Sequence, residues 1–415
     1  MKFKLLLFAI VINCYFNIGL FPQTFSGGDG SENDPYLISN FTDIEELTNL
    51  VNVGYPQGNV VWSNVKYFIL TQDIINDSVK VPIGRYFPSG GANLMGSFEG
   101  YFDGNGHKIA LGINHSLMHQ PAGLFGAIRN ATIINVKVVG YVNSSVEIFG
   151  AIVGSSINSV IKNCVNYASV TAIGTAAGGI VGECSDNSII ENCTNIGAIT
   201  SIGIGNSYTP IGMGGIAFAV SSGAIMTNCL NIGSILNNRT AFCLHYRIGG
   251  LAGVLNVGTI TNSINAGFIS SNVENVVPYE QGNGVGGIAG ITGTTGVGSV
   301  MTNCINTGVV EGPVGTTGAI TNIRYTNSTI ANCHYDKQFC IHKGVNGQDV
   351  SGVSPHLTRN MVGRKLANLL GDNDWTYVEG ATLIQSLYPQ LKVLDHTDAS
   401  KVGASPIYLY DGIKD

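Results

Sequence analysis

The chain has 415 residues, a formal net charge of −6 and 11% charged residues, against about 25% in an average soluble domain. This length suits two or three ordinary domains or one elongated repeat structure, and 56 glycines, about twice the usual share, favour the repeat. Since no basic cluster accompanies the negative net charge, the composition argues against a nucleic-acid partner.

The N-terminus has the pattern of an export signal. Two lysines, Lys2 and Lys4, precede an apolar run that starts at Leu5. This order is typical of a secretory signal peptide, which we place at residues 1–23. Beyond it, no apolar run approaches the ~18 residues of a membrane span. We therefore expect a secreted or cell-surface protein with no membrane span after signal removal.

Residues 27–120 differ in pattern from the rest of the chain and are predicted to form an N-terminal cap. The stretch 42–54 begins with Thr42 and Glu45 at the spacing of a capping box and continues with apolar residues at helical spacing. Strand-like stretches follow at 66–74 and 98–113. A solenoid needs such a cap because its first coil exposes backbone groups and apolar core.

A repeat then occupies residues 121–335. ENCTNIGAIT at 191–200 returns as MTNCLNIGSI at 226–235 and as MTNCINTGVV at 301–310, each after a glycine-rich signature such as GGIVG or GGLAG. Successive motifs lie 28 to 41 residues apart and show β-like spacing. Periods of about 20–50 residues indicate a solenoid. The sequence therefore predicts an all-β, right-handed parallel β-helix of about seven coils, with caps that contain short helices.

Two columns of residues are predicted at one corner of this β-helix. The first Asn of each motif tolerates the left-handed conformation of a turn, and its amide can bond the Asn one coil away. The residue after it, usually Cys, is predicted to point inward as a small hydrophobe and not to form disulfides. The expected columns are Asn163, Asn192, Asn228, Asn262, Asn303 and Asn332, and beside them Cys164, Cys193, Cys229, Cys304 and Cys333.

Some cysteines and the end of the chain do not follow the repeat. Cys184, Cys243 and Cys340 fall outside the column, and their pairing stays open. Residues 336–397 are predicted to form a C-terminal cap with a helix at 357–370 that ends at Gly371. Residues 398–415 are interpreted as a linker, the start of a further segment, or a frayed tail.

The repeat region is poor in groups that catalyse reactions. Glycosidases need paired carboxylates, and β-helix lyases need acidic metal ligands with a basic residue. Only Glu183, Asp186 and Glu191 lie close together in the repeats, and we interpret them as a solvated turn. His334, between Cys333 and Cys340, does not have the spacing of a zinc site. We expect no enzymatic activity, no cofactor and no bound metal.

The three longest repeats carry their extra residues at the same point, directly before the glycine-rich signature. These insertions, at 201–213, 236–248 and 271–285, should project from one edge of the solenoid. Each brings a tyrosine, and two bring charges, a combination that suits sugar or peptide ligands. The alternative is that these are tolerated loops whose tyrosines cover the coil edge. The predicted binding residues are Tyr208, Arg239, His245, Tyr246, Arg247, Glu274, Tyr279 and Glu280.

The glycine-rich signatures followed by N-C-x-N-x-G resemble the GLUG motif repeats of large bacterial surface and secreted proteins. PYLI at 35–38, FEGYFDGNGHKI at 98–109 and AGLFG at 122–126 match the usual lead-in to those repeats, and YPQL at 388–391 matches their exit. The resemblance implies an adhesin-like β-solenoid without a defined activity. Some members add a zinc peptidase domain, but this chain has no HExxH motif, so that activity does not carry over.

These features together predict a non-enzymatic binding module whose partner is a glycan or an extracellular protein, held through the loop edge. One alternative is a structural stalk that spaces another domain from the cell surface. A polysaccharide-active β-helix enzyme is a third possibility, which the scarcity of carboxylates disfavours.

Overall fold

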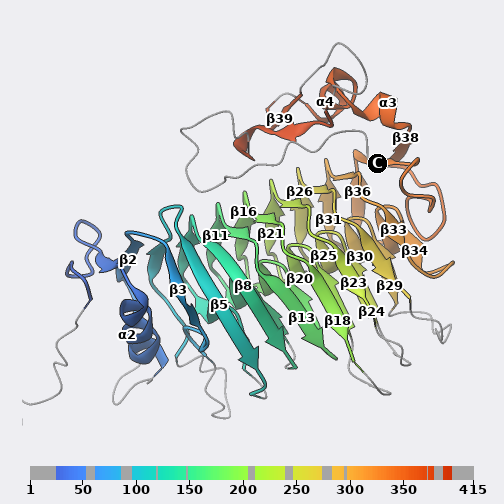
Figure 1. Cartoon of the computed structure of the whole chain (residues 1–415). Coiled ribbons are helices and arrows are strands. Elements are labelled where there is room, and N and C mark those ends of the chain that lie inside the picture. Colours follow the sequence, from blue (N-terminus) through green and yellow to red (C-terminus); the bar gives the residue numbers. More distant parts are fainter. Residues whose placement is uncertain are drawn as a thin grey trace, which may run out of the picture.

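The computed structural model describes residues 25–52, 61–85, 96–117, 120–145, 148–203, 211–238, 246–272, 283–293, 297–371, 373–377 and 387–394. Within them the chain winds into a parallel β-solenoid of about eight turns whose coils stack along one axis (Figure 1). The predicted parallel β-solenoid is confirmed. One apolar core runs from the first coils to the last.

One wall of the solenoid is a parallel sheet of ten short strands, which we call sheet A. In all but the first two of these strands the middle residue points into the core, as Ile161 and Met301 do. The residues on either side face outward, as the two-residue period of a strand requires. Its strands are β1 (Tyr36–Ile38), β2 (Tyr67–Leu70), β4 (Tyr101–Asp103), β7 (Thr132–Ile134), β11 (Val160–Lys162), β16 (Ile189–Glu191), β21 (Ile225–Thr227), β26 (Thr259–Thr261), β31 (Val300–Thr302) and β36 (Thr329–Ala331).

A sharp corner separates sheet A from a fifteen-stranded sheet, sheet B, to which most coils contribute one short and one longer strand. The short strands are β12 (Val165–Asn166), β17 (Thr194–Asn195), β22 (Leu230–Asn231), β27 (Ile264–Asn265), β32 (Ile305–Asn306) and β37 (Cys333–Asp336). The others are β3 (Ile74–Val79), β5 (Lys108–His115), β8 (Lys137–Ser144), β13 (Ser169–Ile173), β18 (Ile199–Ile202), β23 (Ile235–Asn237), β28 (Ile269–Ser271), β33 (Val310–Glu311) and β38 (Val353–His356).

Two further sheets complete each coil. The glycine-rich signatures of the sequence lie where the chain passes from sheet D to sheet C. Sheet D contains β9 (Ile148–Gly150), β14 (Ala176–Gly178), β19 (Ile211–Gly214), β24 (Tyr246–Gly249), β29 (Gly284–Gly286) and β34 (Thr317–Gly318). Sheet C contains β6 (Phe125–Arg129), β10 (Val153–Ile157), β15 (Val181–Ser185), β20 (Ala217–Ser221), β25 (Ala252–Asn256), β30 (Ala289–Thr292) and β35 (Thr321–Arg324).

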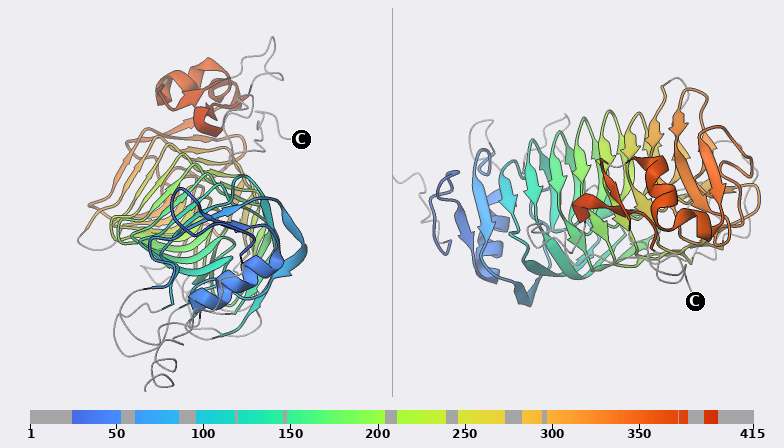
Figure 2. Two further views of the ribbon diagram at one scale, coloured as in Figure 1. Left: turned by 90° about the vertical axis from the view of Figure 1, so that its left-hand side faces the viewer. Right: turned by 90° about the horizontal axis from the view of Figure 1, so that it is seen from above.

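The N-terminal region differs in part from the predicted cap. Strands β1, β2 and β4 continue sheet A, so this region already forms coils. Helix α2 (Phe41–Asn52) lies at the N-terminal end of the stack (Figure 2). It begins earlier than expected, because Asn40 and Asp43, and not Thr42 and Glu45, exchange side-chain to backbone hydrogen bonds.

The region predicted as a C-terminal cap has two parts. Cys340, Val345 and Val353 join the core beyond the last full coil and so cover its end. The following segment turns back and lies beside the coils (Figure 2). It consists of α3 (Thr358–Met361), α4 (Arg364–Leu370), β39 (Trp375–Thr376), β40 (Gln390–Leu391) and a 3-10 turn at Lys392–Leu394. The predicted single helix is broken at Gly363, whose φ is 66°.

We call the described part of this segment, residues 358–371, 373–377 and 387–394, the lateral brace. Its apolar residues, among them Met361, Leu366 and Trp375, pack on three outward side chains of consecutive coils, Leu230, Ile264 and Ile305. Two hydrogen bonds add to this contact. The Asn262 amide donates to Asp374 at 2.9 Å, and the Asn332 amide donates to the Leu369 carbonyl at 3.0 Å. The described helices include none long and apolar enough to span a bilayer.

Candidate functional site

Three connections from sheet B to sheet D begin and end at equivalent positions of consecutive coils. They lie between β18 and β19, between β23 and β24, and between β28 and β29. The strands before and after them pair in register with those of the neighbouring coil, so the segments start and end at equivalent positions. The segments themselves, at 204–210, 239–245 and 273–282, lie outside the described residues. So do six predicted binding residues, namely Tyr208, Arg239, His245, Glu274, Tyr279 and Glu280.

Tyr246 does not face this edge. Its side chain is 0% exposed and belongs to the core, and its hydroxyl lies 2.7 Å from the Thr316 hydroxyl. The Asn283 side chain accepts a hydrogen bond from the Tyr246 amide at 2.9 Å. The prediction that Tyr246 offers its ring to a ligand is therefore wrong, because β24 re-enters the stack at this residue and turns the side chain inward.

Arg247 is half-buried at the start of β24. Its partners in register on the adjacent coils are Gly212 and Gly284. Burial lowers the pKa of the guanidinium, and its Nε has no hydrogen-bond partner among the described residues. Arg247 is thus a predicted binding residue that lies at the loop edge, and its Nε–H could donate a hydrogen bond to a ligand.

The first Asn of each motif forms the predicted column at the corner between sheets A and B. These residues have φ between 46° and 55°, the left-handed conformation that Asn tolerates. Side-chain hydrogen bonds of 3.1 Å, from Nδ2 of one Asn to Oδ1 of another, connect Asn135, Asn163 and Asn192. Equivalent hydrogen bonds of 3.1 and 2.8 Å connect Asn262, Asn303 and Asn332. The column is interrupted between the two runs. The side-chain carbonyls of Asn192 and Asn228 have no partner within the described coils.

The cysteine column is confirmed as an inward stack of thiols. Cys164, Cys193, Cys229, Cys304 and Cys333 are free and fully buried. Each thiol donates to the carbonyl two residues earlier at 3.2 to 3.5 Å. Cys184 and Cys340 are also free and buried, whereas Cys243 lies outside the described residues. The column therefore has a packing role.

A second Asn column, which the sequence analysis did not assign, lies inside the same corner. From each coil to the next, the side-chain amide of one Asn donates to the Oδ1 of the following Asn at 2.8 Å, and this series has no break. The same amide also donates to the backbone carbonyl two residues ahead in its own coil. The signal was present in the second Asn of N-C-x-N. Its members are Asn166, Asn195, Asn231, Asn265 and Asn306, all fully buried.

The three carboxylates that lie close together in the sequence of the repeats have different surroundings in the structure. Glu191 forms an ion pair with Lys162 at 3.0 Å on the outside of sheet A. Glu183 lies on sheet C, where burial and the nearby Asp186 raise the pKa of its carboxyl. The trio predicted as a solvated turn is thus divided between two walls. No group of three His, Cys, Asp or Glu suited to a metal occurs in the parts of the chain that the structure describes.

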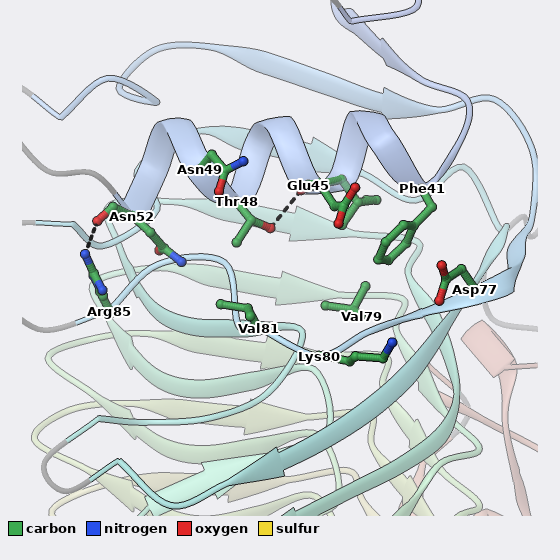
Figure 3. A pocket seen from close by; sticks show the side chains of 11 residues that line it. Phe41, Glu45, Thr48, Asn49, Asn52, Asp77, Val79, Lys80, Val81 and Arg85 are labelled. Carbon is green, nitrogen blue, oxygen red and sulfur yellow. Dashed lines mark hydrogen bonds between the residues drawn. The ribbon is translucent and has the colours of Figure 1, made fainter.

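A pocket that the sequence did not reveal lies between α2 and the segment 77–85 (Figure 3). Its volume is about 530 Å³. Asn52 fixes one wall, because its amide donates to the Pro82 carbonyl and its Oδ1 accepts from the Gly84 amide, both at 2.8 Å. The Arg85 guanidinium closes that end with a bond to the Asn52 carbonyl. The lining is mixed and comprises Phe41, Ile44, Glu45, Thr48, Asn49, Asn52, Asp77, Val79, Lys80, Val81 and Arg85.

Comparisons with known proteins yield one match to a solved structure and one short sequence match. No protein-family model matches the chain. A curated "Putative Gly-rich membrane protein" of Evansella cellulosilytica is 27% identical over 152 residues, which are 35% of this chain and 16% of that protein. The crystal structure of a "putative immunoglobulin A1 protease" from Bacteroides ovatus is 21% identical, with a TM-score of 0.48 over 89% of this chain and 95% of that chain.

Proposed function

We propose that the protein is an exported, non-enzymatic binding module of the adhesin-like kind, whose ligand is a glycan or an extracellular protein. The observation that carries the proposal is the loop edge. The strands that flank the three insertions start and end at equivalent positions of consecutive coils. The Asn and Cys columns, in contrast, make packing contacts and hydrogen bonds within the fold. In repeat proteins, insertions aligned in this way form a joint surface.

Export is part of the proposal. The lysines and apolar run of residues 1–23 support it, as does the resemblance to GLUG repeat proteins of bacterial surfaces. The short match to a protein described as a membrane protein agrees with a location at the cell envelope. The test is fractionation of cells that express the full chain. Protein retained in the cytoplasm with residues 1–23 uncleaved would contradict export.

The binding test compares three proteins on arrays of glycans and matrix proteins. The first is the full chain, the second carries Tyr208→Ala, Arg247→Ala and Tyr279→Ala at the loop edge, and the third carries Val81→Lys in the pocket beneath α2. Loss of binding in the loop-edge variant alone supports the proposal. Loss in the pocket variant alone moves the site to α2, and circular dichroism confirms that each variant is folded.

The second candidate function is a stalk. The observation that favours it is the straight stack of coils braced along one side (Figure 1). A stalk has no ligand of its own, so it predicts that none of the three proteins binds any surface on the arrays.

A further inference from the structure

The outer face of sheet A is a strip that the described residues leave open to solvent. From β2 to β36, nine parallel strands follow one another in register. Each presents two outward side chains, so the face has two straight columns. The first column is Tyr67, Tyr101, Thr132, Val160, Ile189, Ile225, Thr259, Val300 and Thr329, and the second is Ile69, Asp103, Ile134, Lys162, Glu191, Thr227, Thr261, Thr302 and Ala331.

This face is apolar and nearly neutral. The described residues leave every member of the two columns half-buried or exposed, with Ile225 at 37% and Val300 at 38%. Lys162 and Glu191 neutralise each other, and Asp103 accepts hydrogen bonds from the Asn105 backbone and the Asn135 amide. The polar atoms that remain are mostly threonine hydroxyls. The face therefore offers aliphatic surface and hydroxyl groups but little net charge.

Two aromatic rings lie side by side at the N-terminal end of the face. The centroids of Tyr67 and Tyr101 are 5.3 Å apart, and their planes are inclined by 34°. Both rings are half-buried, so one part packs on the sheet while the rest is open. Tyrosine rings present an apolar surface and a polar tip together, which suits a ligand that also has both.

The size of the face limits what can occupy it. Nine strands about 4.8 Å apart give a strip about 38 Å long, and three residues across give a width of about 10 Å. The strip therefore covers about 400 Å², half of the ~800 Å² per partner that a stable protein interface needs. A second copy of the chain is a poor occupant for this reason. An extended peptide is poor too, because backbone groups inside a sheet are already paired and only free edges add a strand.

We infer that the outer face of sheet A binds a neutral, extended polysaccharide chain that lies along the solenoid axis. Such a polymer is long and narrow like the strip and carries no charge. Its rings also have C–H faces for Tyr67, Tyr101 and the aliphatic columns, and hydroxyl edges for the threonines. The inference rests on the proposed role as an exported binding module, but it places the ligand on a surface other than the loop edge.

The test is co-sedimentation of the full chain with two insoluble neutral polysaccharides, cellulose and chitin, and with insoluble pectate as an acidic one. The first variant carries Tyr67→Ala and Tyr101→Ala. The matched control carries Tyr141→Ala and Phe268→Ala, which removes two aromatic rings from residues that are each 38% exposed, one in β8 of sheet B and the other directly before β28. A second variant, Ile189→Lys with Ile225→Lys, places charge in the middle of the strip and leaves the aromatic pair intact.

The expected result is binding to a neutral polysaccharide that falls at least about tenfold in both sheet A variants and is unchanged in the control. Equal binding by all variants, or binding to pectate alone, overturns the inference. The loop-edge variant with Tyr208→Ala, Arg247→Ala and Tyr279→Ala distinguishes this inference from the proposed binding at the loop edge. If it loses array ligands but still sediments with polysaccharide, the two sites are independent, whereas if it loses both, the sheet A site is refuted.

Discussion

The buried Asn column allows a quantitative prediction at Asn231. Its side chain accepts from the Asn195 amide at 2.8 Å and donates to Asn265 Oδ1 at 2.8 Å and to the Gly233 carbonyl at 3.0 Å. The substitution Asn231→Ala removes all three bonds from a fully buried site. At about 1 kcal/mol for each net hydrogen bond, we expect the free energy of unfolding to fall by about 3 kcal/mol.

We expect the free energy of unfolding to fall by no more than about 3 kcal/mol, because the neighbouring Asn side chains keep other hydrogen bonds. Asn195 keeps its bond to the Gly197 carbonyl at 3.0 Å, and Asn265 keeps the Gly267 amide at 3.2 Å. The matched control is Asn228→Gly, three residues earlier in the outer column. Asn228 Oδ1 has no partner within the described residues, and glycine accepts its φ of 53° without strain, so the expected cost is below about 1 kcal/mol.

Urea unfolding followed by circular dichroism measures both variants. Hydrogen exchange at the amides of Leu230 and Ile264, which bond to the preceding coil, localises the effect. If Asn231→Ala is as mild as Asn228→Gly, the buried column does not hold the coils together and the reasoning is refuted.

Three further predictions concern other parts of the corner and the C-terminal junction. Gly233→Ala should abolish soluble folded protein, because a Cβ there would lie 2.2 Å from the Gly197 carbonyl oxygen. The control is Gly315→Ala, which meets nothing within 4 Å and suffers only the cost of about 1–2 kcal/mol of a side chain at a φ of 83°; equal yields would contradict this. The five column cysteines should not react with a thiol reagent until the protein unfolds, since burial removes access and raises the pKa of thiols such as Cys164, and labelling of native protein followed by peptide mapping checks it. Burial and the adjacent His356 lower the pKa of His334 to about 4, below the usual ~6.5, so the folded state binds fewer protons than the unfolded state between these values. Stability should therefore fall as pH decreases from about 6.5 toward 4, and His334→Gln should flatten that slope in urea titrations; an unchanged slope would show that another group is responsible.

The sequence was sufficient to predict the solenoid because the motif repeats wherever the backbone makes the same turn. Asn163 and Cys164 could be assigned to a corner and to the core from residue type alone, and both assignments hold. The inner column was missed because an Asn that usually stands two residues before a glycine looks like turn chemistry, and only stacking shows that Asn166 is fully buried.

Other features depend on contacts that have no local signature. Leu366 and Trp375 show that the C-terminal segment must bury apolar surface, but they do not show whether it lies across the end of the stack or along its side. The decisive partners, Leu230 and Ile264, look in the sequence like any other core residues. Tyr246 was misassigned for a similar reason, because one residue separates a loop from a strand and reverses the direction of the side chain.

The lateral brace changes how the stack can come apart. In a solenoid whose coils touch only their neighbours, coils can be lost one at a time from either end. Here the lateral brace contacts the coils of β22, β27 and β32 together, so the last coil cannot leave until the brace has been released from all three. Under a protease or a pulling force the C-terminal coils should then fail as a single block, while the N-terminal coils fray one by one. Unfolding of the solenoid should therefore proceed from its N-terminal coils toward the coils that the lateral brace contacts.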